Sequence, residues 1–255
     1  MSWQELYTKH AKYYHILDGA SINYPKFAKE LDIIFKKYSV RRVLDFACGI
    51  GKLDIELKKL GYNVTGVDLS NNMLKEALLN SKKEKVSFEI LEGNLRTDVI
   101  GKFDAIICTY NYVGHFSKEE LIKIIDNFKR NLNKGGLILF DIFNFKFMDK
   151  NFKSEPFIDV SRTMGEISAT RFNQNELDRK NKLMKINQTT FIQDNILKWY
   201  NDVWDLRIYS LEELKEMLKN DFEIINVYGS IFGDSMFCPY SDDKECIVIL
   251  GRLKN

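Results

Sequence analysis

Glycines and carboxylates combine in two short stretches of this sequence in a way that could bind a ligand. Residues 45–51 read Asp-Phe-Ala-Cys-Gly-Ile-Gly and stand between an apolar run and an amphipathic segment. Glycines at a strand–helix junction let the backbone approach a ligand closely, beside the amino end of the helix. Asp68 ends the next apolar run. A carboxylate at that place can accept hydrogen bonds from both hydroxyls of a ribose.

The acids around the glycine loop indicate what charge the ligand carries. The dinucleotide fingerprint G-x-G-x-x-G would need a glycine where Asp54 stands. Asp45, at the start of the loop, would put a second carboxylate beside a diphosphate. A ligand with a cationic centre and an ammonium group suits these acids better. We therefore rank an NAD-dependent oxidoreductase below a protein that binds such a cation.

Candidate catalytic residues lie outside this loop. His115 follows a further apolar run, and a neutral imidazole can accept a proton because its ordinary pKa is about 6.5. A proton acceptor, a substrate contact and a structural role all stay open for it. Tyr13 and Tyr14 could close over a ligand, or pack on a helix face. The three histidines have no metal-ligand spacing, so we expect no metal site.

Two residues further along the chain are candidates for binding an acceptor. Arg171 and Trp199 stand in segments that read as strands. A guanidinium that faced inward would hold an anionic group in bidentate fashion. Alternatively, both side chains are exposed to solvent at a strand edge and bind no acceptor.

The elements that must position these residues alternate between strands and helices. We expect strands at 41–46, 63–68, 86–90, 103–109 and 137–143, and helices at 52–60, 71–81 and 117–132. Such alternation predicts crossover connections and a parallel sheet with helices on both faces. A helix at 210–218 and strands at 223–228 and 246–250 should close it. The expected fold is therefore α/β, a Rossmann-like doubly wound sheet of seven strands.

Four segments follow from this reading. Residues 1–40 form an N-terminal helical lid, and residues 41–145 form the ligand-binding core. Residues 146–208 form an inserted antiparallel meander that covers the active site, with turns at 173–175 and 193–195. Residues 209–255 supply the last helix and the closing strands.

The motifs together carry a family resemblance. Residues 43–51, 64–70, 103–107 and 132–136 resemble the class I S-adenosylmethionine (SAM) dependent methyltransferases. The resemblance implies that the loop holds the methionine part of SAM and that Asp68 binds its ribose. It also implies that Leu69 and Leu95 flank the adenine and that Asn94 stands where an acid usually accepts from the adenine amino group. The expected cofactor contacts are Asp45, Ala47, Gly49, Gly51, Asp68, Leu69, Asn94, Leu95 and Tyr110.

Within that family, the segments around Tyr14 and His115 resemble those of the bacterial sugar N,N-dimethyltransferases. There a tyrosine and a histidine at these places face the active site, which makes Tyr14 and His115 the expected catalytic residues. The expected substrate contacts are Tyr13, Tyr14, His115, Arg171 and Trp199. His15 replaces the usual acid after the tyrosine, so the acceptor stays open.

Composition limits the remaining choices. The net charge is +2, no apolar run approaches 18 residues, and the cysteines form no C-x-x-C pair. The first residues lack a signal-peptide pattern. We expect a cytoplasmic monomer or homodimer that binds neither nucleic acid nor membrane. Its reaction would move a methyl group from SAM to O or N of a small polar metabolite, with a nucleotide-linked or phosphorylated sugar among the candidates. A tRNA or protein methyltransferase and a non-catalytic SAM-binding module are the alternatives.

Overall fold

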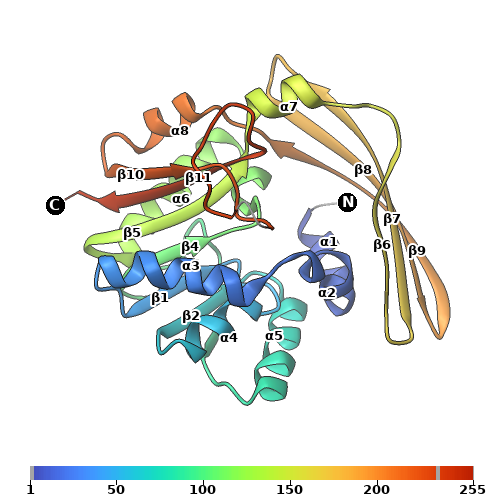
Figure 1. Cartoon of the computed structure of the whole chain (residues 1–255), viewed down its shortest axis with the longest axis horizontal. Coiled ribbons are helices and arrows are strands. Elements are labelled where there is room, and N and C mark those ends of the chain that lie inside the picture. The colour runs from blue at the N-terminus through green and yellow to red at the C-terminus, as the bar shows by residue number, and fades with distance from the viewer. Residues whose placement is uncertain (1–2, 234–235, 255) are drawn as a thin grey trace.

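The computed structural model describes residues 3–233 and 236–254 and contains two β-sheets (Figure 1). The larger sheet has seven strands in the order β10–β11–β5–β4–β1–β2–β3. Its strands are β1 (Arg42–Phe46), β2 (Asn63–Asp68), β3 (Glu89–Glu92), β4 (Phe103–Cys108), β5 (Leu132–Phe143), β10 (Phe222–Tyr228) and β11 (Cys246–Leu253). Neighbours from β3 to β5 are parallel, and β11 runs antiparallel to both β5 and β10. The predicted Rossmann-like fold is confirmed.

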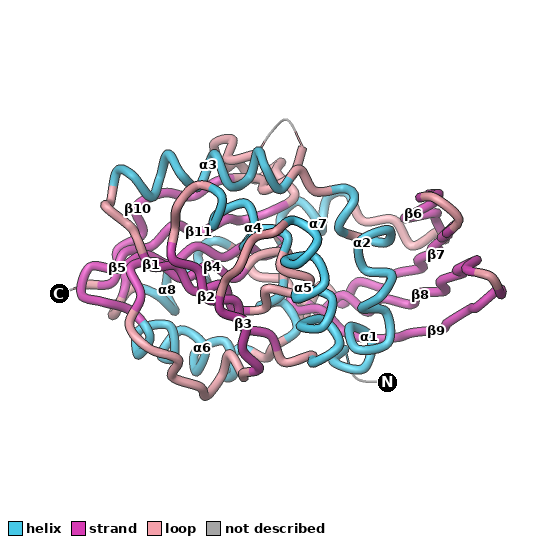
Figure 2. Tube along the Cα trace, turned by 90° about the horizontal axis from the view of Figure 1, so that it is seen from below, coloured by secondary structure: helices cyan, strands magenta, loops and turns pink. Residues whose placement is uncertain are grey.

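Helices cover both faces of this sheet, which is why its strands are apolar runs. Figure 2 shows α3 above the sheet and α6 below it. The covering helices are α3 (Tyr24–Lys37), α4 (Lys52–Lys59), α5 (Asn71–Glu84), α6 (Lys118–Asn131) and α8 (Leu211–Leu218). Leu44 lies in the core beneath α6 and α8, whereas its neighbour Val43 lies in the core beneath α3 and α4. Successive strand residues are therefore both buried, on opposite faces.

Local signals in the sequence set several element ends. Ser117 and Ser210 each accept a hydrogen bond from the backbone N–H three residues further on, where a glutamate completes the capping box. Several boundaries differ from the prediction, and α5 and β11 each end three residues later than expected. β3 begins three residues later, and β5 begins at Leu132 and continues through Gly135 and Gly136, with a break in its register against β4.

The second sheet is antiparallel and follows chain order, β6–β7–β8–β9. Its strands are β6 (Phe157–Met164), β7 (Ile167–Asp178), β8 (Leu183–Asp194) and β9 (Ile196–Arg207), preceded by α7 (Phe145–Asn151). The predicted turn at 173–175 is wrong, because these residues lie inside β7. Asn173 accepts a hydrogen bond from Gln188 on β8, which satisfies a polar side chain within the sheet. Sequence analysis also missed α7 and β6.

The N-terminal helices lie between the two sheets (Figure 1). They are α1 (Trp3–His10), the 3₁₀ turns Ala11–Tyr13 and Gly19–Ser21, and α2 (Tyr14–Leu17). On one side Thr8 contacts Ser70 and accepts from Asn72 at the start of α5. On the other side Lys9 and His10 both contact Asp202 of β9. Every helix in the described part of the chain is too short or too polar to cross a membrane.

Candidate active site

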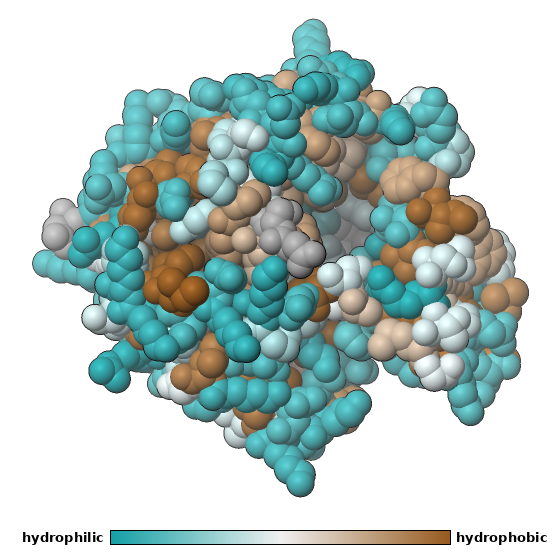
Figure 3. Space-filling model, viewed as in Figure 1, coloured by the Kyte–Doolittle hydropathy of each residue, from teal (hydrophilic) through white to brown (hydrophobic). Residues whose placement is uncertain are grey.

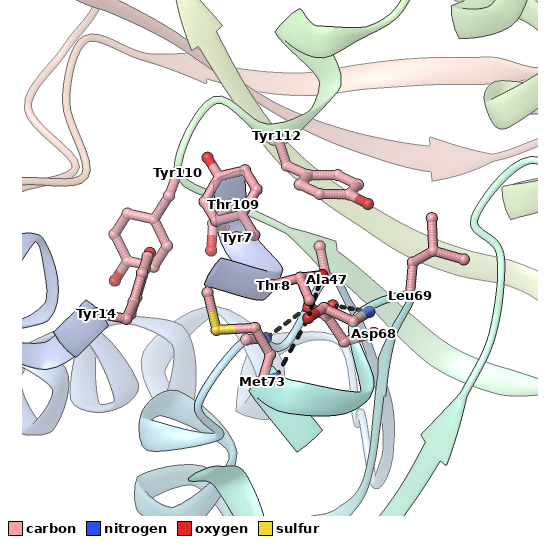
Figure 4. Close-up of a pocket in the computed structure, with 12 residues that line it drawn as sticks. Tyr7, Thr8, Tyr14, Ala47, Asp68, Leu69, Met73, Thr109, Tyr110 and Tyr112 are labelled. Atoms are coloured by element: carbon pink, nitrogen blue, oxygen red, sulfur yellow. Dashed lines mark hydrogen bonds between the residues drawn. The ribbon is translucent and has the colours of Figure 1, made fainter. Parts of the chain in front are cut away.

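A pocket lies at the carboxyl ends of β1, β2 and β4, where open α/β sheets bind ligands (Figure 4). The space between its lining residues, about 550 Å³, includes open solvent. The described residues that line it are Tyr7, Thr8, Tyr14, Ala47, Gly49, Asp68, Leu69, Ser70, Met73, Thr109, Tyr110 and Tyr112. A smaller pocket beside it adds Asp45, Tyr24 and Lys52, among others. Six of the predicted site residues, Tyr14, Ala47, Gly49, Asp68, Leu69 and Tyr110, therefore line the larger pocket.

The glycine loop opens its backbone toward the pocket. Ala47, Gly49 and Gly51 have φ values of +65°, +54° and +69°. A Cβ on Gly49 would meet no atom within 4 Å, so this position faces open space. A Cβ on Gly51 would approach Phe88 to 2.9 Å, so the glycine here allows close packing. Gly51 lines neither pocket.

Asp68 joins the two loops at the pocket floor. Its Oδ2 accepts from the backbone N–H of Gly49 at 2.9 Å, and its Oδ1 accepts from the backbone N–H of Ser70 at 2.8 Å. These bonds hold both oxygens in place beside the pocket (Figure 4). Each carboxylate oxygen keeps lone-pair capacity for a further donor, such as a ribose hydroxyl.

Three buried carboxylates surround the loop. Burial raises the pKa of Asp68 to about 6 and that of Asp54 to about 8, and it raises the pKa of Asp45 as well. Neither oxygen of Asp54 has a hydrogen-bond partner in the described structure. The pKa values of the three carboxyls rise because a buried negative charge is costly without a compensating cation. A bound cation would favour the charged form of these carboxyls, which fits a ligand with a sulfonium and an ammonium group, as SAM has. Within residues 3–233 and 236–254, no group of three or more His, Cys, Asp or Glu side chains could hold a metal.

Tyrosines form the wall opposite the glycine loop. Tyr7 and Tyr14 come from α1 and α2, and Tyr110 and Tyr112 come from the loop after β4 (Figure 4). Burial raises the pKa of all four, so the phenols are neutral. Sequence analysis missed Tyr7 and Tyr112 as pocket residues. The spacing of Tyr7 and Tyr14, seven residues apart on helical segments, was the available signal for Tyr7.

His115 lies beside the tyrosine wall and does not line either pocket. Its Nε2 is 3.2 Å from the hydroxyl of Tyr7, and its ring packs edge-on against Tyr7 and Tyr112. Burial lowers the pKa of His115 to about 3. The imidazole is therefore neutral at physiological pH and a weak base.

Asn94 and Leu95 follow β3 and line neither pocket. The side-chain oxygen of Asn94 accepts from the backbone N–H and the Nε of Arg96, at 3.0 and 3.3 Å. Leu95 is buried in the core beneath α6. Their predicted contacts with adenine stay predictions.

Tyr13, Arg171 and Trp199 do not line either pocket, and their predicted contacts with substrate stay predictions. The hydroxyl of Tyr13 donates to Asp194, on the side of the second sheet. Arg171 pairs with both Asp18 and Asp159, so its charge is already compensated.

Trp199 is the third predicted substrate contact outside both pockets. Its side chain is 62% exposed on the outer face of the second sheet, whereas its neighbour Tyr200 packs against His10. Strand alternation sends the two side chains to opposite faces. Apolar side chains are visible on the lobe that this sheet forms (Figure 3).

The fold is similar to that of class I SAM-dependent methyltransferases. Residues 43–136 match the family model described as "Methyltransferase domain". The chain is similar to YqeM of Bacillus subtilis (strain 168), provisionally named a methyltransferase: 29% identity, covering 70% of this chain and 72% of YqeM. It is also similar to the glycine/sarcosine N-methyltransferase of Aphanothece halophytica, with 31% identity over 60% of this chain and 56% of that protein. The chain thus spans little more than half of this second relative.

Two solved structures share the fold. A SAM-dependent methyltransferase from Clostridium acetobutylicum ATCC 824 has a TM-score of 0.81 and 21% identity, covering 98% of this chain and 100% of that one. The sugar N-methyltransferase KedS8 from Streptoalloteichus sp. ATCC 53650 has a TM-score of 0.71 and 17% identity, covering 91% and 89%. At these identities the likeness concerns the fold.

Proposed function

We propose that this protein transfers a methyl group from SAM to the nitrogen of a small, polar amine, which reacts in its uncharged form. The observation that carries the proposal is the make-up of the pocket. Its described lining includes four neutral tyrosines and no lysine or arginine. Aromatic faces attract cations by about 0.5–2 kcal/mol, whereas they offer no such attraction to a phosphate.

The state of His115 favours nitrogen over oxygen. SAM supplies an electrophilic methyl group, and the protein's task is to hold the nucleophile in line at about 3–3.5 Å. A hydroxyl acceptor must lose its proton, but the pKa of His115 is lowered to about 3, so it is a poor base at pH 7. A neutral amine attacks with its own lone pair. We infer that His115 orients Tyr7 through the contact between its Nε2 and the Tyr7 hydroxyl. We also infer that Tyr14, whose phenol stays protonated, lies beside the acceptor.

Other acceptors have less support. A phosphorylated or nucleotide-linked acceptor would need a cation, and Arg171 is engaged by two acids. A tRNA acceptor fits poorly with a net charge of +2. The similar proteins named for glycine, sarcosine and sugar N-methylation support an amine.

The test measures S-adenosylhomocysteine (SAH) release from SAM with a panel of acceptors. The panel pairs each amino acid or amino sugar with its hydroxyl counterpart, and it includes unmodified tRNA. We expect turnover with at least one amine and none with the matched hydroxyl compound. Turnover confined to a hydroxyl compound or to tRNA would contradict the proposal.

With an amine acceptor found, His115→Ala sharpens the test. We expect a loss of kcat smaller than the ~10²–10⁴-fold that removal of a general base costs, with most of the effect in the acceptor KM. A loss within that range at saturating acceptor would restore His115 as the base.

A further inference from the structure

A buried carboxylate of β5 lies beneath the turn that brings Tyr110 to the pocket. Asp141 is 0% exposed and stands near the carboxyl end of β5. Its Oδ2 accepts a hydrogen bond from the backbone N–H of Asn111 at 2.9 Å. Asp141 lines neither pocket, so any effect on the ligand must pass through that turn.

The turn has an unusual backbone. Tyr110 and Asn111 have φ values of +66° and +56°, so two consecutive residues with side chains adopt the left-handed conformation. Residues other than glycine avoid this conformation, and it persists only where the surroundings hold it. Two such residues in a row, at the mouth of a pocket, therefore need a specific restraint.

Several contacts in addition to Asp141 provide that restraint. The side-chain oxygen of Asn111 accepts from the backbone N–H of Phe143, at 3.1 Å, two residues beyond Asp141 on β5. The backbone N–H of Gly114 donates to the carbonyl of Asn111 at 3.0 Å. A Cβ on Gly114 would come within 2.9 Å of the Asn111 side chain, so a larger residue there would have to displace that side chain. Asn111 is thus held from β5 at both its backbone and its side chain.

The turn decides where Tyr110 lies. The Tyr110 ring lines both pockets and packs edge-on against Tyr24 and Phe27 of α3 (Figure 4). A return of the turn to ordinary backbone angles would rotate this ring out of the pocket wall.

We propose that Asp141 is a positioning residue of the SAM site: it holds the Tyr110–Asn111 turn left-handed and so places the Tyr110 ring against the bound cofactor. This inference goes beyond the proposed function and does not depend on which acceptor is methylated. It requires only that SAM or SAH binds.

The experiment compares SAH affinities by titration calorimetry, well below the melting temperature of each variant. We expect Asp141→Ala to weaken SAH binding at least tenfold, because the Asn111 N–H then has no acceptor. Asp141→Asn keeps an oxygen that can accept this bond, and we expect it to bind SAH within about threefold of the original protein. Equal losses in the two variants would contradict the hydrogen-bond account, and original affinity in Asp141→Ala would overturn the proposal.

Asp104→Ala is the matched control. Asp104 accepts from the backbone N–H groups of Arg41 and Arg42, at 3.0 and 2.9 Å, but it stands at the opposite end of β4. We expect this variant to lose thermal stability and to keep its SAH affinity within about twofold. A loss of affinity equal to that of Asp141→Ala would show that general destabilisation is the cause.

A pair of variants at Asn111 tests the turn directly if Asp141→Ala does not fold. Glycine adopts the left-handed conformation freely, whereas valine strongly disfavours it. We expect Asn111→Val to weaken SAH binding at least tenfold and Asn111→Gly to stay nearer to the original protein. Equal SAH affinity in these two variants would overturn the proposal.

Discussion

Asp68 is the side chain on which the two ligand-binding loops converge. Asp68→Ala removes the acceptor for two backbone N–H groups and for the ribose hydroxyls, and each charge-assisted hydrogen bond is worth about 1.5–3 kcal/mol. We expect SAM affinity to fall by at least tenfold, with a smaller effect on turnover at saturating SAM. Calorimetry with SAM measures this, and Asp68→Asn should give an intermediate loss. Unchanged affinity in Asp68→Ala would remove this residue from the site.

Asp54 makes the stability of the ligand-free protein depend on pH. Burial raises its pKa from 3.8 to about 8, so between these values the folded chain binds more protons than the unfolded chain. Its contribution to stability therefore falls as pH rises through this window. The asparagine of Asp54→Asn cannot titrate. We therefore expect the melting temperature of this variant, relative to that of the original protein, to rise between about pH 5 and pH 8.

Thermal melts of both proteins at each pH check this, because titrating groups that do not interact with Asp54 cancel in the difference. The gain should level off above about pH 8, where the aspartate is ionised in both states. A melting difference that is the same at every pH would contradict the prediction.

At the scale of elements, α1 is the link between the cofactor pocket and the second sheet. It supplies Tyr7 and Thr8 to the pocket, and its Lys9 and His10 bind Asp202 of β9. The position of one pocket wall is therefore coupled to a sheet that does not line the pocket.

Two adjacent residues of β9 separate this coupling from general strand stability. Tyr200 packs edge-on against His10 and lies beneath the Lys9 ammonium, whereas Trp199 faces outward. Aromatic and cation–π contacts of this kind contribute about 0.5–1.5 kcal/mol each. We expect Tyr200→Ala to weaken SAH binding by about 3- to 10-fold. Trp199→Ala, measured by the same titration, should leave it unchanged, and equal effects would refute the coupling.

For the whole molecule, the acids and glycines together predict which cofactor stabilises the fold. SAM or SAH near 100 times its Kd should stabilise the protein by about 2.7 kcal/mol. In a chain of this size that shifts the melting temperature by about 5–10 °C. NAD, whose diphosphate would meet the carboxylate of Asp45, should give no shift. A thermal shift with NAD and none with SAM would reverse the assignment.

Much of the seven-stranded sheet and its helices can be predicted from short segments of the sequence. The apolar runs, the capping boxes at Ser117 and Ser210, and the order of the glycine loop and Asp68 are all short-range features. They predicted the seven-stranded sheet, and with it the edge where Asp45, Gly49 and Asp68 meet. The carboxyl ends of parallel strands must share one edge, so this part of the site needs no long-range information.

The sequence by itself therefore determined the class of fold and the half of the pocket that the glycine loop and Asp68 line. The tertiary structure alone decided the other half: which face of β9 carries Trp199, which acids bind Arg171, and that Tyr7 stands between His115 and the pocket. These outcomes depend on how α1 packs between two sheets, and a contact between residues as distant as His10 and Asp202 leaves no local pattern. The left-handed turn at Tyr110 belongs to the same group, because its restraint, Asp141, comes from a strand thirty residues further along the chain.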